Sequence, residues 1–116
     1  EKLVLISPGM YDTKPTFEGF VGLFGLDEVY YGDRIFALAE SIHGINPGAL
    51  GLDRFAAQIE TKTLIVHCKD DKDSVKEIAL DLHGDMKNSK LHLTEGLGHR
   101  RILRDEKVAK VVLNFL

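Results

Sequence analysis

The chain has 116 residues, 44% of them hydrophobic, and a formal net charge of -3 at pH 7. This length and apolar content suit one compact globular domain and argue against a disordered chain or a coiled coil. The 15 basic residues are spread along the sequence, so charge gives no reason to expect nucleic acid or an anionic membrane as a partner. We therefore expect the partner to be a small molecule or another protein.

Cysteine content and hydropathy bear on the compartment. Cys68 is the single cysteine of the sequence, which excludes an intrachain disulfide framework and a cysteine-built zinc site and suits a reducing compartment. No apolar run approaches the roughly 20 residues of a membrane helix, and no charged-then-apolar leader opens the chain. We expect a cytoplasmic protein. No methionine precedes Met10, so we expect either that processing, proteolysis or truncation removed an earlier segment or that the sequence is part of a longer chain.

The first predicted element is a strand. Residues 3–6 form a continuous β-prone run that ends in Ser7, Pro8 and Gly9. This pattern predicts a buried central strand of a parallel sheet followed by a turn.

Residues 10–51 differ in composition from the predicted strand before them, because glycines are interspersed among aromatic and aliphatic residues there. The one helix predicted in this stretch covers about residues 33–43, with Asp33 as its N-cap. We interpret residues 10–51 as an excursion from the sheet. A short amphipathic helix is predicted next, at residues 52–58.

The remaining residues alternate between strands and helices. Strands are predicted at residues 63–67 and at residues 90–94, the second nearer an edge because it alternates between apolar and polar residues. Between them, Ser74 and Glu77 form a capping-box pattern, and Gly84 supplies a left-handed helix stop.

Asp105 is predicted to cap a last helix, which has an apolar face made by Val108, Val111, Val112 and Phe115. Alternating strands and helices predict an α/β fold with parallel βαβ units.

Polar residues follow the predicted strands, at Ser7, within residues 70–73 and at His99. Right-handed crossovers bring these strand ends to one edge of the sheet, where the active sites of open α/β sheets lie. An aspartate and a histidine there are two of the three members of a nucleophile–histidine–acid triad. No Gly-x-Ser-x-Gly elbow, the usual setting of a serine nucleophile, occurs in the sequence.

Two short motifs carry a family resemblance. Leu-Ile-Val-His at residues 64–67 has an aspartate four residues after its histidine, and Gly-Leu-Gly-His follows at residues 96–99. Over about residues 61–116 the chain resembles the C-terminal half of an α/β-hydrolase. The resemblance implies that Asp71 is the triad acid and that His99 is the triad base. More loosely, residues 3–8 resemble the strand after the nucleophile helix, and residues 10–51 resemble the variable cap of that family.

The position of the acid stays open between neighbours. The family usually has a small residue after the strand histidine and Val-Pro beyond the acid, whereas here Cys68 follows that histidine and Ser-Val-Lys follows the acidic run. Asp71 is therefore the first candidate, Asp73 the second and Asp70 the third.

Each candidate also has a plainer interpretation. His99 could act as general base, or could be a loop histidine that only ends the strand; its two preceding glycines favour a tight turn that aims the side chain. Asp71 could hold the histidine in one tautomer, or could be a solvated loop aspartate. Burial in the sheet is the expected role of His67 and Cys68.

Other reactive side chains lack a motif. None of the serines, Ser7, Ser41, Ser74 and Ser89, has the strand-turn-helix context of a nucleophile. His43, His83 and His92 lack ligand spacing, so we expect no metal site and no cofactor. Arg100, Arg101 and Arg104 suit a solvated helix entrance.

We therefore predict that residues 1–116 are the C-terminal part of an α/β-hydrolase domain, with three parallel strands, flanking helices and an inserted helical cap segment. The chain would supply the acid and the histidine of a serine-type enzyme that cleaves an ester, thioester or amide of a small-molecule substrate, and would be inert alone. The alternative is a noncatalytic binding module. Because the strand at residues 3–6 would lack a neighbour, we expect association with a missing N-terminal half or with a second copy.

Overall fold

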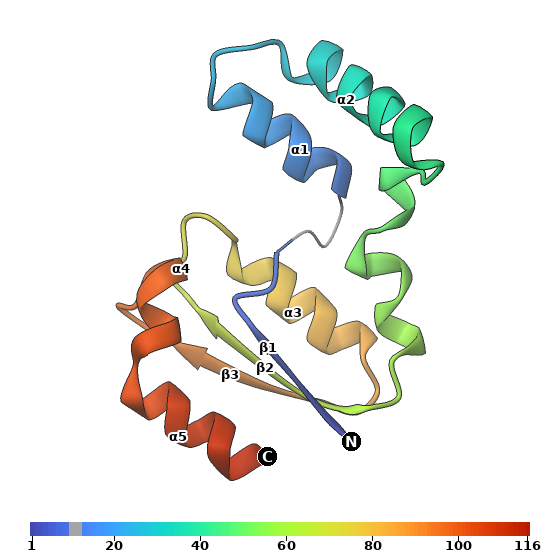
Figure 1. Ribbon diagram of the computed structural model, residues 1–116. Coiled ribbons are helices and arrows are strands. Elements are labelled where there is room, and N and C mark those ends of the chain that lie inside the picture. Colours follow the sequence, from blue (N-terminus) through green and yellow to red (C-terminus); the bar gives the residue numbers. More distant parts are fainter. Residues whose placement is uncertain (10–12) are drawn as a thin grey trace. The chain divides into compact units, whose positions relative to one another are not determined.

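The computed structural model of the protein describes residues 1–9 and 13–116 (Figure 1). The chain divides into two compact units, one made of Glu1–Gly9 and Ala56–Leu116 and the other of Met10–Phe55. The predicted start of the inserted segment, Met10, lies outside the described residues.

The first unit is built on a three-stranded parallel sheet. Its strands are β1 (Lys2–Ile6), β2 (Lys62–Cys68) and β3 (Ser89–Thr94), in the spatial order β1-β2-β3. The predicted mixed α/β class with three parallel strands is confirmed, and so is the edge position of the third strand. The central position predicted for residues 3–6 is wrong, because β2 occupies the centre and β1 the other edge of this sheet.

Burial of the strands follows that order. Six consecutive residues of β2 are buried, whereas the apolar residues of β1 are only partly buried. An apolar run of four residues has the same sequence pattern in either position, so the pattern alone does not distinguish a central strand from an edge strand.

Helices α3 (Lys76–Asp85) and α5 (Glu106–Phe115) pack against the sheet (Figure 1). Alternate residues of β2 point to opposite faces, and one set contributes Leu64, Val66 and Cys68 to a core cluster. Ile102 and Val108 complete the buried part of that cluster, and the apolar face of α5 packs against it. The predicted apolar face of the last helix is therefore the face that covers the sheet.

The start and the end of α3 differ from the prediction. Val75 is the N-cap residue and provides no side-chain hydrogen bond, while the Ser74 hydroxyl donates to the carbonyl oxygen of Pro8 at 2.7 Å. The predicted capping box is wrong because the helix starts one residue later, with Val75 and not Ser74 as its N-cap. The helix also continues through Gly84 to Asp85, so the predicted stop at Gly84 is wrong.

The start of α5 agrees with the prediction. Asp105 Oδ1 accepts hydrogen bonds from the backbone N–H groups of Lys107 and Val108, at 2.9 and 3.0 Å. A short helix, α4 (Gly98–Arg101), and a 3₁₀ turn, η4 (Ile102–Arg104), lie between β3 and α5.

The second unit is a pair of helices, α1 (Thr13–Gly22) and α2 (Glu28–His43), followed by short 3₁₀ turns. The N-cap of α2 is Asp27, whose side chain accepts from Tyr30 N at 2.7 Å, so the predicted start at Asp33 is wrong. Sequence reasoning missed α1, because glycines and Pro15 mask its pattern; proline is tolerated in the first turn of a helix.

Residues 52–58 also differ from the prediction of one helix. They form two 3₁₀ turns, η2 (Leu52–Arg54) and η3 (Ala56–Gln58), after a first such turn, η1 (Pro47–Ala49).

The second unit exposes large apolar side chains, among them Phe20, Leu23, Phe24, Val29, Leu38 and Ile42. Within residues 1–9 and 13–116, no helix combines the length and the apolar character needed to cross a membrane.

Candidate active site

The ends of β2 and β3 bring an aspartate and a histidine together. Asp71 lies three residues beyond the end of β2, and His99 lies in α4, shortly after β3. Because the two strands are parallel neighbours, the segments that follow them lie at the same edge of the sheet. His99 Nδ1 donates a hydrogen bond to Asp71 Oδ2 at 2.8 Å.

The environment of Asp71 favours its ionised form. Its side chain is 0% exposed, and Oδ1 accepts hydrogen bonds from the backbone N–H groups of Asp73 and Ser74, both at 2.9 Å. Burial acts to raise the pKa of this carboxyl, but the two N–H groups and His99 outweigh burial and hold the pKa below its usual value. Asp71 is therefore a buried carboxylate whose negative charge is met by three donors.

The hydrogen bond to Asp71 also determines the tautomer of His99. An ionised carboxylate can only accept hydrogen bonds, so Nδ1 must carry the proton. In the neutral ring, Nε2 is then the unprotonated nitrogen, able to act as a base. The side chain is 37% exposed, so a reacting group can approach it.

The two alternative acids have other roles in the structure. Asp73 contributes its backbone N–H to Asp71. Asp70 Oδ1 accepts hydrogen bonds from Cys68 Sγ at 3.0 Å and from Gly96 N at 2.7 Å. Among the described residues, Asp71 is thus the aspartate that hydrogen-bonds His99.

Two glycines shape the turn that leads to His99. Gly96 and Gly98 have φ angles of 76° and 61°, which L side chains rarely adopt. The sequence motif therefore marks a real backbone requirement, as expected.

His67 and Cys68 are buried in the sheet, as expected. His67 Nδ1 donates to the carbonyl oxygen of Cys68 at 3.0 Å. Its Nε2 lies 3.9 Å from Asp71 Oδ2 and has no hydrogen-bond partner among the described residues. The same holds for the buried hydroxyl of Ser7, whose φ of 46° is unusual for a non-glycine residue.

Three residues near the ends of β2 and β3 lie close enough together to be considered as metal ligands. Asp71, Asp73 and His99 each offer one ligand atom, and these atoms lie within 4.8 Å of one another. However, both oxygens of Asp71 are already bound, by His99 Nδ1 and by the backbone N–H groups of Asp73 and Ser74. We assign no metal to the cluster.

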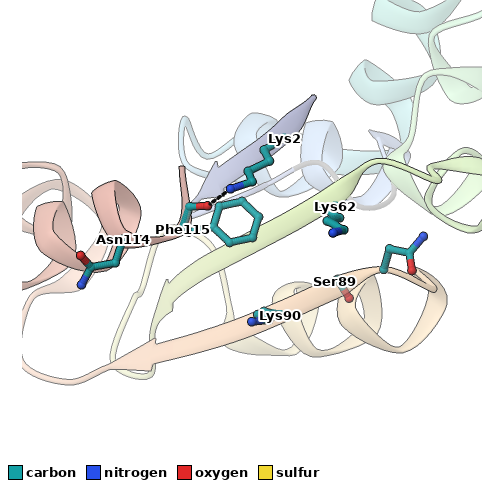
Figure 2. Close-up of a pocket in the computed structure, with 7 residues that line it drawn as sticks. Lys2, Lys62, Ser89, Lys90, Asn114 and Phe115 are labelled. Atoms are coloured by element: carbon teal, nitrogen blue, oxygen red, sulfur yellow. Dashed lines mark hydrogen bonds between the residues drawn. The ribbon is translucent and has the colours of Figure 1, made fainter.

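A separate hollow of about 430 Å³ lies at the amino-terminal ends of the three strands (Figure 2). Three lysines line it, Lys2, Lys62 and Lys90. Lys2 Nζ donates to the carbonyl oxygens of Phe115 and Leu116, at 2.6 and 3.0 Å. The hollow lies at the amino ends of the strands, away from Asp71 and His99, and it contains no acid–base pair.

The chain was compared with protein-family models, with curated proteins and with solved structures, and none of these comparisons gave a match. The geometry of Asp71 and His99 is therefore the observation from which function is inferred.

Proposed function

We propose that this chain supplies the acid and the base of a serine-type catalytic triad, as the C-terminal part of an α/β-hydrolase. The observation that carries the proposal is the 2.8 Å hydrogen bond from His99 Nδ1 to the buried carboxylate of Asp71. It joins the ends of two neighbouring parallel strands and leaves Nε2 available as a base. On this proposal, residues 10–51 correspond to the cap segment of the family.

The pair can perform the proton transfers of acyl transfer. Nε2 of His99 would take the proton of a serine hydroxyl as that oxygen attacks the carbonyl carbon of an ester, thioester or amide. Asp71 would stabilise the imidazolium that forms. The imidazolium would then return the proton to the leaving group, and a water would release the acyl group in the second half of the cycle.

The nucleophile would come from outside the described residues. Ser74, Ser41 and Ser89 donate their hydroxyls to backbone carbonyl oxygens. Ser7 is buried after β1, and no serine of residues 1–9 and 13–116 has a hydrogen bond to His99. The exposed edge of β1 is where a further strand could pair, since an edge strand offers unpaired backbone groups. A strand that leads to a nucleophile elbow would complete both the sheet and the triad.

The first test uses the 116-residue chain alone and an activated ester, p-nitrophenyl acetate. We expect hydrolysis to equal that of the His99→Ala variant, because the nucleophile and the oxyanion donors are missing. Hydrolysis by the wild-type chain clearly above that of His99→Ala would contradict the proposal.

The second test restores the missing part. The coding sequence upstream of Glu1 is predicted to encode Gly-x-Ser-x-Gly roughly 20 to 40 residues earlier, the room needed for a crossover helix and its loops. Adding that segment in trans should restore ester hydrolysis. His99→Ala should abolish the restored activity, and Asp71→Asn should lower it by about 10⁴-fold.

His83→Ala serves as the matched control, because His83 is an exposed histidine of α3. It should leave the restored activity unchanged. Binding of the added segment without any turnover would instead support the alternative, a noncatalytic interaction module.

A further inference from the structure

The turn of residues 96–98 has an unusual set of hydrogen-bond acceptors. The backbone N–H of Gly96 donates to Asp70 Oδ1 at 2.7 Å. The next two N–H groups, of Leu97 and Gly98, donate to Cys68 Sγ at 3.3 and 3.2 Å. All three N–H groups of this turn are therefore bound by two side chains at the end of β2.

The two acceptor side chains are also bonded to each other. Cys68 is fully buried, and its thiol donates to Asp70 Oδ1 at 3.0 Å. A thiol is a weak donor and a weak acceptor, but a hydrogen bond to an ionised carboxylate is stronger than one between neutral groups. The thiol and the N–H of Gly96 hold the pKa of Asp70 below its usual value, so the carboxylate stays charged at neutral pH.

The carbonyl side of the turn is bound as well. Arg101 Nη2 donates to the Gly96 oxygen at 2.8 Å, and Arg101 Nε donates to the Leu97 oxygen at 3.1 Å. Arg101 is exposed, so we expect water to replace these bonds more readily than those of the buried thiol.

We propose that Cys68 and Asp70 are positioning residues, which hold the turn of residues 96–98 so that His99 meets Asp71. His99 follows Gly98 directly, so a shift of this turn moves the imidazole relative to the Asp71 carboxylate, which the loop after β2 holds through the N–H groups of Asp73 and Ser74. A displacement of about 1 Å is enough to break a hydrogen bond of this length. The inference rests on the proposed function only where it calls the Asp71–His99 pair catalytic.

The test uses the ¹⁵N-labelled 116-residue chain and NMR at neutral pH. Two readouts are measured, the tautomer of His99 from its ring nitrogen shifts and the hydrogen exchange of the amides of residues 96–98. In Cys68→Ala we expect the amides of Leu97 and Gly98 to exchange about tenfold faster, because they lose their acceptor. We also expect a mixture of His99 tautomers in place of Nδ1–H alone.

A second variant and two controls accompany it. Asp70→Ala, at an exposed position, should free the N–H of Gly96 and disturb the His99 tautomer in the same direction. Cys68→Ser keeps an acceptor and should retain most of the wild-type signal. Lys69→Ala removes an exposed ion pair to Glu95 between the same two segments and should leave both readouts unchanged.

The inference is overturned if folded Cys68→Ala and Asp70→Ala both keep the wild-type tautomer and the wild-type exchange rates. If Cys68→Ala does not fold, Asp70→Ala alone decides, because its side chain is exposed. A wild-type chain without the Nδ1–H tautomer would overturn the proposed acid–base pair itself, which is a different outcome from loss of positioning.

Discussion

At the scale of single residues, Asp71 combines burial with charge. An isolated buried carboxylate would be strongly destabilising, but here two backbone N–H groups and His99 bind its two oxygens. Both members of this pair were expected from the sequence, because each follows a predicted strand and because the family resemblance implies these two positions.

The positioning residues could not be predicted in the same way. Cys68 and Asp70 were expected to be a buried strand residue and a minor acid candidate. Their contact with the turn of residues 96–98 depends on the approach of two loops in space, and no spacing in the sequence encodes that approach.

Stability in acid provides a test of Asp71. Its pKa is lower in the folded chain than the ordinary value of about 3.9, so ionised Asp71 adds to the free energy of unfolding above that pH. This contribution is lost as the pH falls through the lowered folded-state pKa. We expect urea denaturation to show a decrease in stability below about pH 4.

The comparison variant is Asp71→Asn, in which this decrease should be smaller. Asp81→Asn, at an exposed position on α3, is the control and should follow the wild-type curve. An acid dependence of Asp71→Asn identical to that of the wild type would show that the carboxylate does not have the lowered pKa.

At the scale of the elements, some helix starts were predicted correctly and others were not. Asp105 was predicted as an N-cap and is one, because its carboxylate accepts from the backbone N–H groups of Lys107 and Val108. Ser74 was predicted as a cap and is not, because α3 starts one residue later, with Val75 as its N-cap. Helix α1 was not predicted because it contains glycines, which lower helix propensity but do not prevent a helix.

The cap of α5 carries the second prediction. Asp105→Ala removes the acceptor for two N–H groups and should lower the free energy of unfolding by about 1 kcal/mol. Asp105→Asn, which retains a side-chain oxygen, should lower it by less than half of that amount. Equal losses in the two variants, measured by urea denaturation, would mean that the charge rather than the cap hydrogen bonds stabilises α5.

At the scale of the whole molecule, the three parallel strands were predicted correctly, but the centre of the sheet was not. A parallel strand that is read as central needs a neighbour on each side, and β1 has one neighbour among the described strands. Whether a strand is central depends on which other strands pair with it. The sequence of the strand itself does not contain that information.

The exposed edge of β1 leads to a prediction about assembly. Unpaired strand edges and exposed apolar side chains both favour association. Sedimentation velocity of the 116-residue chain should therefore show a mass that rises with concentration. A monomer at every concentration would contradict the prediction that the edge of β1 promotes association.

The ring nitrogens of His99 test the central claim most directly. In the ¹⁵N NMR spectrum of the wild-type chain, we predict that the neutral His99 ring is protonated on Nδ1, because Asp71 Oδ2 accepts that proton at 2.8 Å. In Asp71→Asn the side-chain amide can donate to Nδ1, and the proton should move to Nε2. A wild-type ring protonated on Nε2, or a tautomer that is unchanged in Asp71→Asn, would contradict the assignment of Asp71 and His99 as an acid–base pair.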